Sequence, residues 1–248
     1  MKKVIVFNLI LMCTSITFAQ KKKSVDTQTQ PIQQPAEVKP ESAKTSGGAG
    51  DHAIKKRVIA TRWNDFDVAK DAMYDLIIED PGNDSLIFQL AYLYYENQKY
   101  PSSILVCKDL LARNPKNTQV LELSAISYES LNIFDRALQS YESMFLLTNS
   151  SSTLYKMAFL QYELKRYPEC MTNADILLSR PDAETLKVGF NTAENKPKEY
   201  PIKVALLNLK GMVYKDQGDK VNAKTQLDEA LKIAPDFLPS KQTLDSLK

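Results

Sequence analysis

The chain has 248 residues, 44% of them hydrophobic and 25% charged, and a formal net charge of +2. With this composition about 190 residues can build a hydrophobic core, and the low glycine content, 7 in all, suits a helical chain. Between residues 51 and 248, 25 lysines and arginines stand against 27 aspartates and glutamates. Because there is no basic excess, and no basic run interleaved with aromatic residues, we expect no nucleic-acid partner.

The first 19 residues have the pattern of a signal peptide. A basic pair at positions 2 and 3 precedes an apolar stretch at residues 4–12, and Thr17-Phe18-Ala19 places small residues before a cleavage site after Ala19. The apolar stretch is shorter than the about 20 residues that span a bilayer. An alternative is a lipoprotein signal ending at Cys13, but Met12 is bulky where such signals carry a small residue. The sequence therefore predicts an exported protein of the bacterial periplasm or cell envelope.

Residues 20–50 are expected to form a disordered linker. They are rich in Gln, Lys, Ser, Thr and Pro, end in a Gly-rich stretch and contain no aromatic residue. Such a segment buries too little apolar surface to offset its ordering entropy. The lysines at 21–23 suggest a peripheral contact with an anionic envelope surface, but each adds only about 1 kcal/mol. A solvated tail is the favoured interpretation.

Tyrosines mark an internal repeat in residues 51–248. Tyr94, Tyr128 and Tyr162 lie 34 residues apart, and Tyr214 follows after one more period plus an 18-residue insertion. A fixed period of this length predicts stacked helix–turn–helix units, each with two helices. Five units are expected, at residues 50–83, 84–117, 118–151, 152–183 and 204–237.

The last unit resembles the tetratricopeptide repeat (TPR). It carries the family's pattern at Leu207, Gly211, Tyr214, Gly218-Asp219, Ala223, Leu227, Ala230 and Pro235. Other units depart from it: the first has Arg57 where a small residue belongs and Ala60 where Tyr belongs, and Asn149 replaces the closing proline of the third. The resemblance implies an all-α fold, a right-handed α-solenoid of about five TPR units in residues 51–248. It also implies that the first helix of each unit, helix A, lines a concave protein-binding groove.

The resemblance assigns candidate partner-binding residues to helix A of repeats 2 to 5. They combine apolar, aromatic and acidic types: Phe88, Tyr92, Tyr95, Glu122, Ile126, Glu129, Leu160, Glu163, Asn208 and Met212. The family's clamp for a C-terminal carboxylate needs Lys and Asn where this chain has Phe88 and Tyr92, so that clamp is absent. We expect the groove to take an apolar segment that carries basic residues. The alternative is that these side chains pack helix A against its neighbours.

The insertion at residues 184–203 is expected to form a small β-hairpin before the last repeat. Apolar residues alternate in 186–190 and 198–202, and a turn-like stretch at 192–197 separates them. A lone hairpin is marginally stable, so it should pack on the solenoid or on a partner. It is a second candidate binding surface, although a structural elaboration is an equal alternative. Residues 239–248 are expected to form a short C-terminal capping helix.

The sequence contains no motif typical of a catalytic or metal-binding site. His52 is the single histidine, and no CxxC or HExxH motif occurs. We therefore expect no catalytic residue, no metal site, no cofactor and no enzyme activity. Cys107 and Cys170 lie on the second helices of two repeats with a third between them, which is too far for a disulfide, so we expect buried free thiols.

The expected function is a non-enzymatic scaffold or adaptor that binds a protein or peptide partner. The alternative is a protein that binds an envelope glycan or a peptidoglycan fragment. A glycan site would need exposed aromatic platforms at Tyr92 and Tyr95. A peptide groove would instead need an apolar trench that continues through Ile126 and Leu160. The sequence names neither the partner nor the oligomeric state.

Overall fold

The computed structural model describes residues 49–248, so the expected signal peptide and nearly all of the expected linker lie outside the described residues. The first helix begins at Ala49, inside the range expected for the linker. The elements in chain order are α1 (Ala49–Arg62), α2 (Phe66–Glu79), α3 (Asp84–Glu96), α4 (Tyr100–Arg113), α5 (Thr118–Ser130), α6 (Phe134–Thr148), α7 (Ser151–Glu163), α8 (Tyr167–Leu178), the short 3-10 helix η1 (Pro181–Glu184), β1 (Lys187–Asn191), β2 (Pro197–Pro201), α9 (Ile202–Asp216), α10 (Lys220–Ile233) and α11 (Leu238–Asp245).

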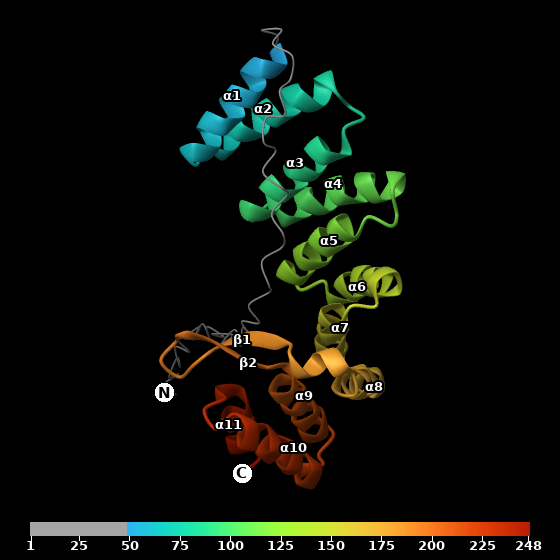
Figure 1. Ribbon diagram of the computed structural model, residues 1–248, viewed down its shortest axis with the longest axis vertical. Helices are drawn as coiled ribbons and strands as arrows, with labels where there is room; N and C mark the ends of the chain where they lie inside the picture. Colours follow the sequence, from blue (N-terminus) through green and yellow to red (C-terminus); the bar gives the residue numbers. More distant parts are fainter. Residues whose placement is uncertain (1–48) are drawn as a thin grey trace, which may run out of the picture.

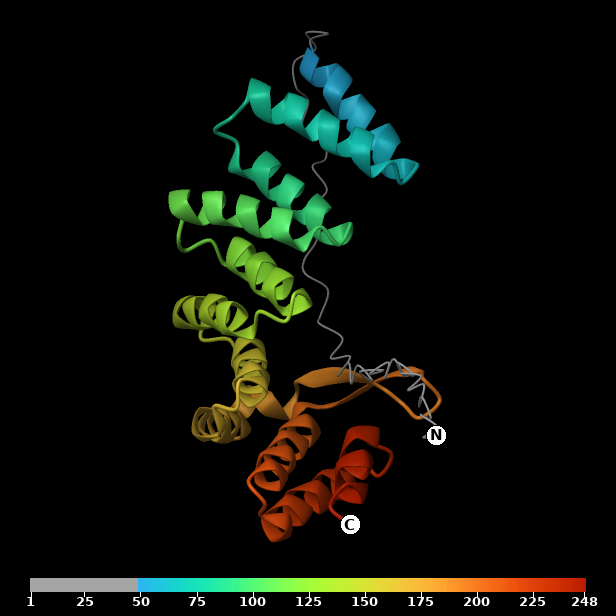
Figure 2. The same ribbon diagram turned by 180° about the vertical axis from the view of Figure 1, so that it is seen from behind.

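The helices stack as five consecutive antiparallel pairs, from α1/α2 to α9/α10, along the long axis of the molecule (Figures 1 and 2). The β1–β2 hairpin lies between the fourth and fifth pairs, and α11 packs on α9 and α10. The expected all-α solenoid with a small hairpin before its last repeat is confirmed.

One backbone conformation recurs at the turn between the two helices of every repeat. A residue in the left-handed region, with φ between 55° and 81°, stands at the same place in each unit: Asn64, Gln98, Asn132, Lys165 and Gly218. The next residue donates its N–H back into helix A, as Lys99 does to the carbonyl of Tyr94 at 2.8 Å and Asp219 to that of Tyr214 at 2.9 Å. These bonds satisfy carbonyls that a helix end would leave unpaired.

Small residues set how closely the two helices of a repeat approach. Ala91, Ala125 and Cys107 are completely buried between helices. In the last repeat a Cβ on Gly211 would lie 2.7 Å from Cγ of Leu227. The close contact between α9 and α10 therefore requires glycine at this position.

Arg180 closes the third repeat, which lacks the terminal proline. Asn149 ends α6 in the left-handed conformation, with φ of 48°. The Arg180 guanidinium donates to the backbone carbonyl of Asn149 at 2.7 Å, to its Oδ1 at 2.6 Å and to Oγ of Ser151 at 3.1 Å. A side chain from the following repeat thus satisfies the helix end.

The helices at the two ends of the stack are held by different contacts. At the N-terminal end, Lys56 forms ion pairs across the α1–α2 contact with Asp71 and, at 3.5 Å, with Asp75. At the C-terminal end, Ser240 on α11 is completely buried and donates from Oγ to Oδ1 of Asn208 on α9 at 3.0 Å. Asn208 is therefore 3% exposed.

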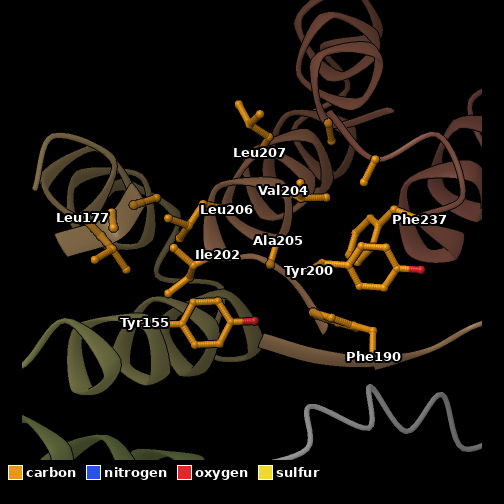
Figure 3. Close-up of a cluster of buried hydrophobic side chains, with 14 of the residues drawn as sticks. Tyr155, Leu177, Phe190, Tyr200, Ile202, Val204, Ala205, Leu206, Leu207 and Phe237 are labelled. Carbon is orange, nitrogen blue, oxygen red and sulfur yellow. The ribbon is translucent and has the colours of Figure 1, made fainter. Parts of the chain in front are cut away.

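The hairpin is part of the hydrophobic core at the C-terminal end of the stack. β1 and β2 are antiparallel, with Val188 opposite Tyr200 and Phe190 opposite Lys198. The rings of Phe190 and Tyr200 each pack edge-on against Phe237, with centroids 4.9 Å apart in both pairs (Figure 3). The expected hairpin is confirmed, and it is anchored on the solenoid.

Candidate partner-binding surface

Four of the ten expected binding residues are buried. Phe88, Ile126 and Leu160 are 7%, 4% and 4% exposed and belong to one core cluster that joins repeats 2 to 4. Asn208 is covered by α11, as described above. For these four the packing alternative holds, because a partner could not reach them without displacing neighbouring helices. The expected apolar trench through Ile126 and Leu160 is not open.

The other six lie at the surface of the first helices of repeats 2 to 5. Tyr92, Tyr95, Glu122, Glu129 and Met212 are half-buried, and Glu163 is more exposed than these, although its carboxyl group is partly covered. With their accessible neighbours they define what we call the A-helix face. Its residues are Tyr92, Tyr95, Glu96, Glu122, Glu129, Lys156, Tyr162, Glu163, Met212 and Asp216.

Aromatic rings occupy the A-helix face in repeat 2. The centroids of Tyr92 and Tyr95 are 6.4 Å apart, and those of Tyr95 and Tyr100 are 5.7 Å apart. Burial raises the pKa of the Tyr92 and Tyr95 hydroxyls, and the neighbouring Glu96 raises that of Tyr92 further. Because Tyr92 and Tyr95 are half-buried, they are not the fully exposed platforms that a glycan site needs.

A polar network joins repeats 3 and 4 on this face. Glu129 accepts a hydrogen bond from the buried Tyr141 hydroxyl at 2.6 Å and lies 3.8 Å from Nζ of Lys156 on α7. Burial raises the pKa of Glu122, and the same Lys156 opposes that rise. Lys156 was not among the expected site residues. Lys156 lies four residues before Leu160 on α7, and this spacing, which places both side chains on one helical face, could have identified it as a site residue.

A second network joins repeats 4 and 5. Asp216 at the end of α9 accepts hydrogen bonds from the hydroxyls of Tyr162 at 2.7 Å and of Tyr167 at 3.4 Å. Burial raises the pKa of Glu163, and the negative charge of Asp216 raises it further. Two carboxylates therefore lie close enough to repel each other here, beside two tyrosine rings whose centroids are 6.0 Å apart.

In each of repeats 2 to 5, the first helix carries a carboxylate in its last turn. These are Glu96 on α3, Glu129 on α5, Glu163 on α7 and Asp216 on α9. The C-terminal end of a helix has a partial negative charge, so an acidic side chain there is unfavourable and a cation is favourable. Within residues 49–248, neither Glu96 nor Glu163 has a basic side chain within 4 Å. We call these four acids the carboxylate row; Glu129 lies 3.8 Å from Lys156 and Asp216 lies 3.7 Å from Lys215.

Cys107 and Cys170 are free and completely buried, as expected. Burial raises the pKa of each thiol to about 12, so neither is a nucleophile near neutral pH. In the described part of the chain, no three His, Cys, Asp or Glu side chains are grouped to hold a metal ion. Among the same residues, no helix is long and apolar enough to cross a membrane.

Comparison with known proteins finds similarity in structure alone. No protein-family model matches the sequence, and no curated protein does. Two crystal structures of MamA superpose with TM-scores of 0.59 and 0.55 at 12% and 14% sequence identity; the match covers 77% of this chain in both cases, and 94% and 97% of those chains. YrrB, described as a TPR protein with an unusual peptide-binding site, superposes with a TM-score of 0.60 at 12% identity over 81% of this chain and 100% of its own. The chain therefore has the fold of a tetratricopeptide-repeat protein.

Proposed function

We propose that the protein is a non-enzymatic scaffold that binds an extended segment of a partner protein along the A-helix face. The observation that carries this proposal is the carboxylate row, one acid at the end of each first helix from α3 to α9. The tyrosines beside it add apolar contact area and hydroxyl groups. YrrB, which shares the fold, is described as having a peptide-binding site, and this supports a peptide as the kind of ligand.

The spacing of the row defines the partner further. Among the first helices, α3 contacts α5 and α7 contacts α9; packed helices lie about 8–10 Å apart, and an extended chain advances about 3.3 Å per residue. A bound segment would therefore match successive carboxylates with a basic residue at about every third position. Apolar residues between them would contact Tyr92, Tyr95 and Met212. No observation favours the glycan alternative, because both tyrosines are half covered.

Labelled peptides test the proposal by fluorescence anisotropy. The probe peptide has lysine at every third position with Thr and Val between, and the control peptide has the same composition with its lysines clustered. We expect the spaced peptide to bind at least about tenfold more tightly, which corresponds to about 1.4 kcal/mol. Equal affinity for the two peptides would indicate non-specific charge attraction and reject the proposed geometry.

Matched variants of the protein locate the site. Glu96→Gln with Glu163→Gln removes two charges of the carboxylate row and should abolish the preference for the spaced peptide. The control replaces the exposed Glu184 and Glu194, which lie on η1 and at the hairpin turn, in the same way. Loss of binding in the control pair, or none in the first pair, would place the binding surface elsewhere.

We also propose that the protein acts in the bacterial periplasm or cell envelope, on the basis of the signal-peptide pattern in residues 1–19. Mass spectrometry of the protein made in its own host measures the N-terminus. A mature chain that starts at Gln20 is expected. A chain that keeps Met1 would reject export, and one that starts at a lipidated Cys13 would replace the periplasm with membrane anchoring.

A further inference from the structure

The two outer edges of the hairpin differ in their capacity for hydrogen bonding. The N–H of Ile202 bonds to the carbonyl of Leu186 at 2.9 Å, and the N–H of Thr192 bonds to that of Lys196 at 2.8 Å. Because hydrogen-bonded pairs alternate along an antiparallel ladder, the pairs Val188–Tyr200 and Phe190–Lys198 also bond inward. The backbone groups of the residues between them point outward. They belong to Lys187, Gly189 and Asn191 on β1 and to Pro197, Glu199 and Pro201 on β2.

Two prolines protect the outer edge of β2. Pro197 and Pro201 lack an N–H, so that edge offers a single outward donor, the N–H of Glu199. Natural sheets use prolines in this way to prevent further strand pairing. The outer edge of β1 has no such protection. It offers three N–H groups and three carbonyls, and none of them bonds to another residue of the described chain.

The hairpin is held in place before any partner arrives. Phe190 and Tyr200 pack on Phe237, and Asp236 accepts hydrogen bonds from Nζ of Lys198 at 2.5 Å and from the Tyr200 hydroxyl at 3.1 Å. Both views of the fold show the hairpin projecting from the stack on the side away from α8 (Figures 1 and 2). A strand that pairs with β1 would therefore meet a preformed template, which lowers the entropy cost of binding.

We propose that the outer edge of β1 accepts an extended segment of a partner protein as a third, antiparallel strand. Main-chain hydrogen bonds to Lys187, Gly189 and Asn191 would hold the segment. An acidic residue opposite Lys187 would complement its charge, since the existing contact of Lys187 with Glu199, at 4.0 Å, is exposed and weak. β-Branched residues fit opposite Val188 and Phe190, and an aromatic ring fits over Gly189, which has no side chain.

This site does not involve the carboxylate row, so each proposal can fail without the other. The probe is a peptide whose central residues are Thr-Val-Tyr-Ile-Glu, written in the direction that places Tyr opposite Gly189 and Glu opposite Lys187. Titration into ¹⁵N-labelled protein should shift the amide signals of Lys187, Gly189 and Asn191. N-methylation of the probe at Tyr removes a donor that faces β1, whereas N-methylation at Val removes one that faces away.

We expect the Tyr-methylated probe to bind at least about tenfold more weakly than the unmodified peptide and the Val-methylated probe to bind unchanged. Equal effects of the two methylations, or no amide shifts with the unmodified probe at millimolar concentration, would overturn the proposal. A matched pair of protein variants, Gly189→Pro and Glu199→Pro, gives the second test. Both keep the inward ladder bonds, and Gly189 does not need a positive φ. The first should lose binding and the second should keep it, with Phe237 packing checked by near-ultraviolet circular dichroism.

Other occupants of the edge give distinct results. Dimerisation in sedimentation that Gly189→Pro abolishes would assign the edge to a second copy of this chain. Protection of the Gly189 amide from hydrogen exchange that disappears when residues 20–48 are removed would assign it to the chain's own N-terminal segment. Either result would overturn the proposal of a separate partner.

Discussion

The hydroxyl of Tyr141 donates to Oε1 of the half-buried Glu129 at 2.6 Å, and the tyrosine itself is only 2% exposed. Tyr155, on the next helix α7, is also buried, at 3% exposure, but its hydroxyl has no hydrogen-bond partner among the described residues. Figure 3 shows its ring within the cluster that holds the hairpin. Two buried tyrosines of the same array therefore contribute to stability in opposite ways.

Removing each hydroxyl in turn should change the free energy of unfolding in opposite directions, or in one variant only. Tyr141→Phe breaks a bond to a charged group and should lower the free energy of unfolding by about 1.5–3 kcal/mol. Tyr155→Phe removes a buried hydroxyl that gains nothing, so unfolding free energy should stay constant or rise by up to about 1 kcal/mol. Urea denaturation followed by circular dichroism measures both. A clear loss of stability in the Tyr155 variant would mean that an ordered water satisfies its hydroxyl.

The left-handed turn predicts another pair of opposite effects. Lys165 and Gly218 occupy the same turn position, with φ of 58° and 81°. The left-handed conformation costs a non-glycine residue about 1–2 kcal/mol. Lys165→Gly should therefore stabilise the protein by about 1 kcal/mol, and Gly218→Lys should destabilise it by about the same. No atom lies within 4 Å of a Cβ placed on Gly218, so the lysine side chain would not clash and the loss of stability would report the backbone conformation alone. Thermal unfolding of both variants checks this, and changes of equal sign would contradict it.

The two thiols should be inert in the folded protein. Burial raises the pKa of Cys107 and Cys170 to about 12, so at pH 8 nearly all of each thiol is protonated as well as inaccessible. Labelling with Ellman's reagent at pH 8 should detect neither thiol in buffer and both in denaturing urea. Rapid labelling of either thiol in buffer would show that its repeat opens locally.

The carboxylate row predicts a pH dependence. Burial and the charge of Asp216 raise the pKa of Glu163 above its ordinary value of 4.5. A carboxyl group with a raised pKa destabilises the fold once it ionises, so its effect is absent below pH 4.5 and grows as the pH rises through the folded-state pKa. Glu163→Gln should therefore raise the melting temperature at pH 7 and leave it unchanged at pH 4. The exposed Glu184→Gln serves as the control, and an increase of the same size at both pH values would reject the electrostatic cause.

The architecture was predictable because equivalent residues of successive repeats recur at a fixed spacing in the sequence. Tyr94, Tyr128 and Tyr162 stand at one place in successive units, and alternation in 186–190 and 198–202 predicted strands within one residue of their observed bounds. The anchor of the hairpin was not predictable, since Phe237 is separated from Phe190 by a whole repeat. Periodicity reports which face of a helix a residue occupies, without reporting what covers that face.

That limit explains the mixed outcome for the site. Ile126 and Leu160 share the helical face of Glu122 and Glu129, yet the apolar pair packs into the neighbouring repeats and the acidic pair stays accessible. Asn208 occupies the position in repeat 5 that Glu122 occupies in repeat 3, but the α11 residue Ser240 covers it. The row of acids is visible in the sequence at helix ends, whereas the approach of Glu163 to Asp216 depends on how α9 stacks on α7 after an insertion of 18 residues.

The covering at the C-terminal end of the stack limits how such a molecule can grow. A solenoid with a bare end can join another copy head to tail and form a filament. Here α11 occupies the C-terminal end through the buried Ser240, whereas α1 exposes the apolar side chains of Ile54, Val58 and Ile59. Head-to-tail contact between two copies would have to displace α11. Growth of the stack at its C-terminal end would therefore begin with the release of this helix.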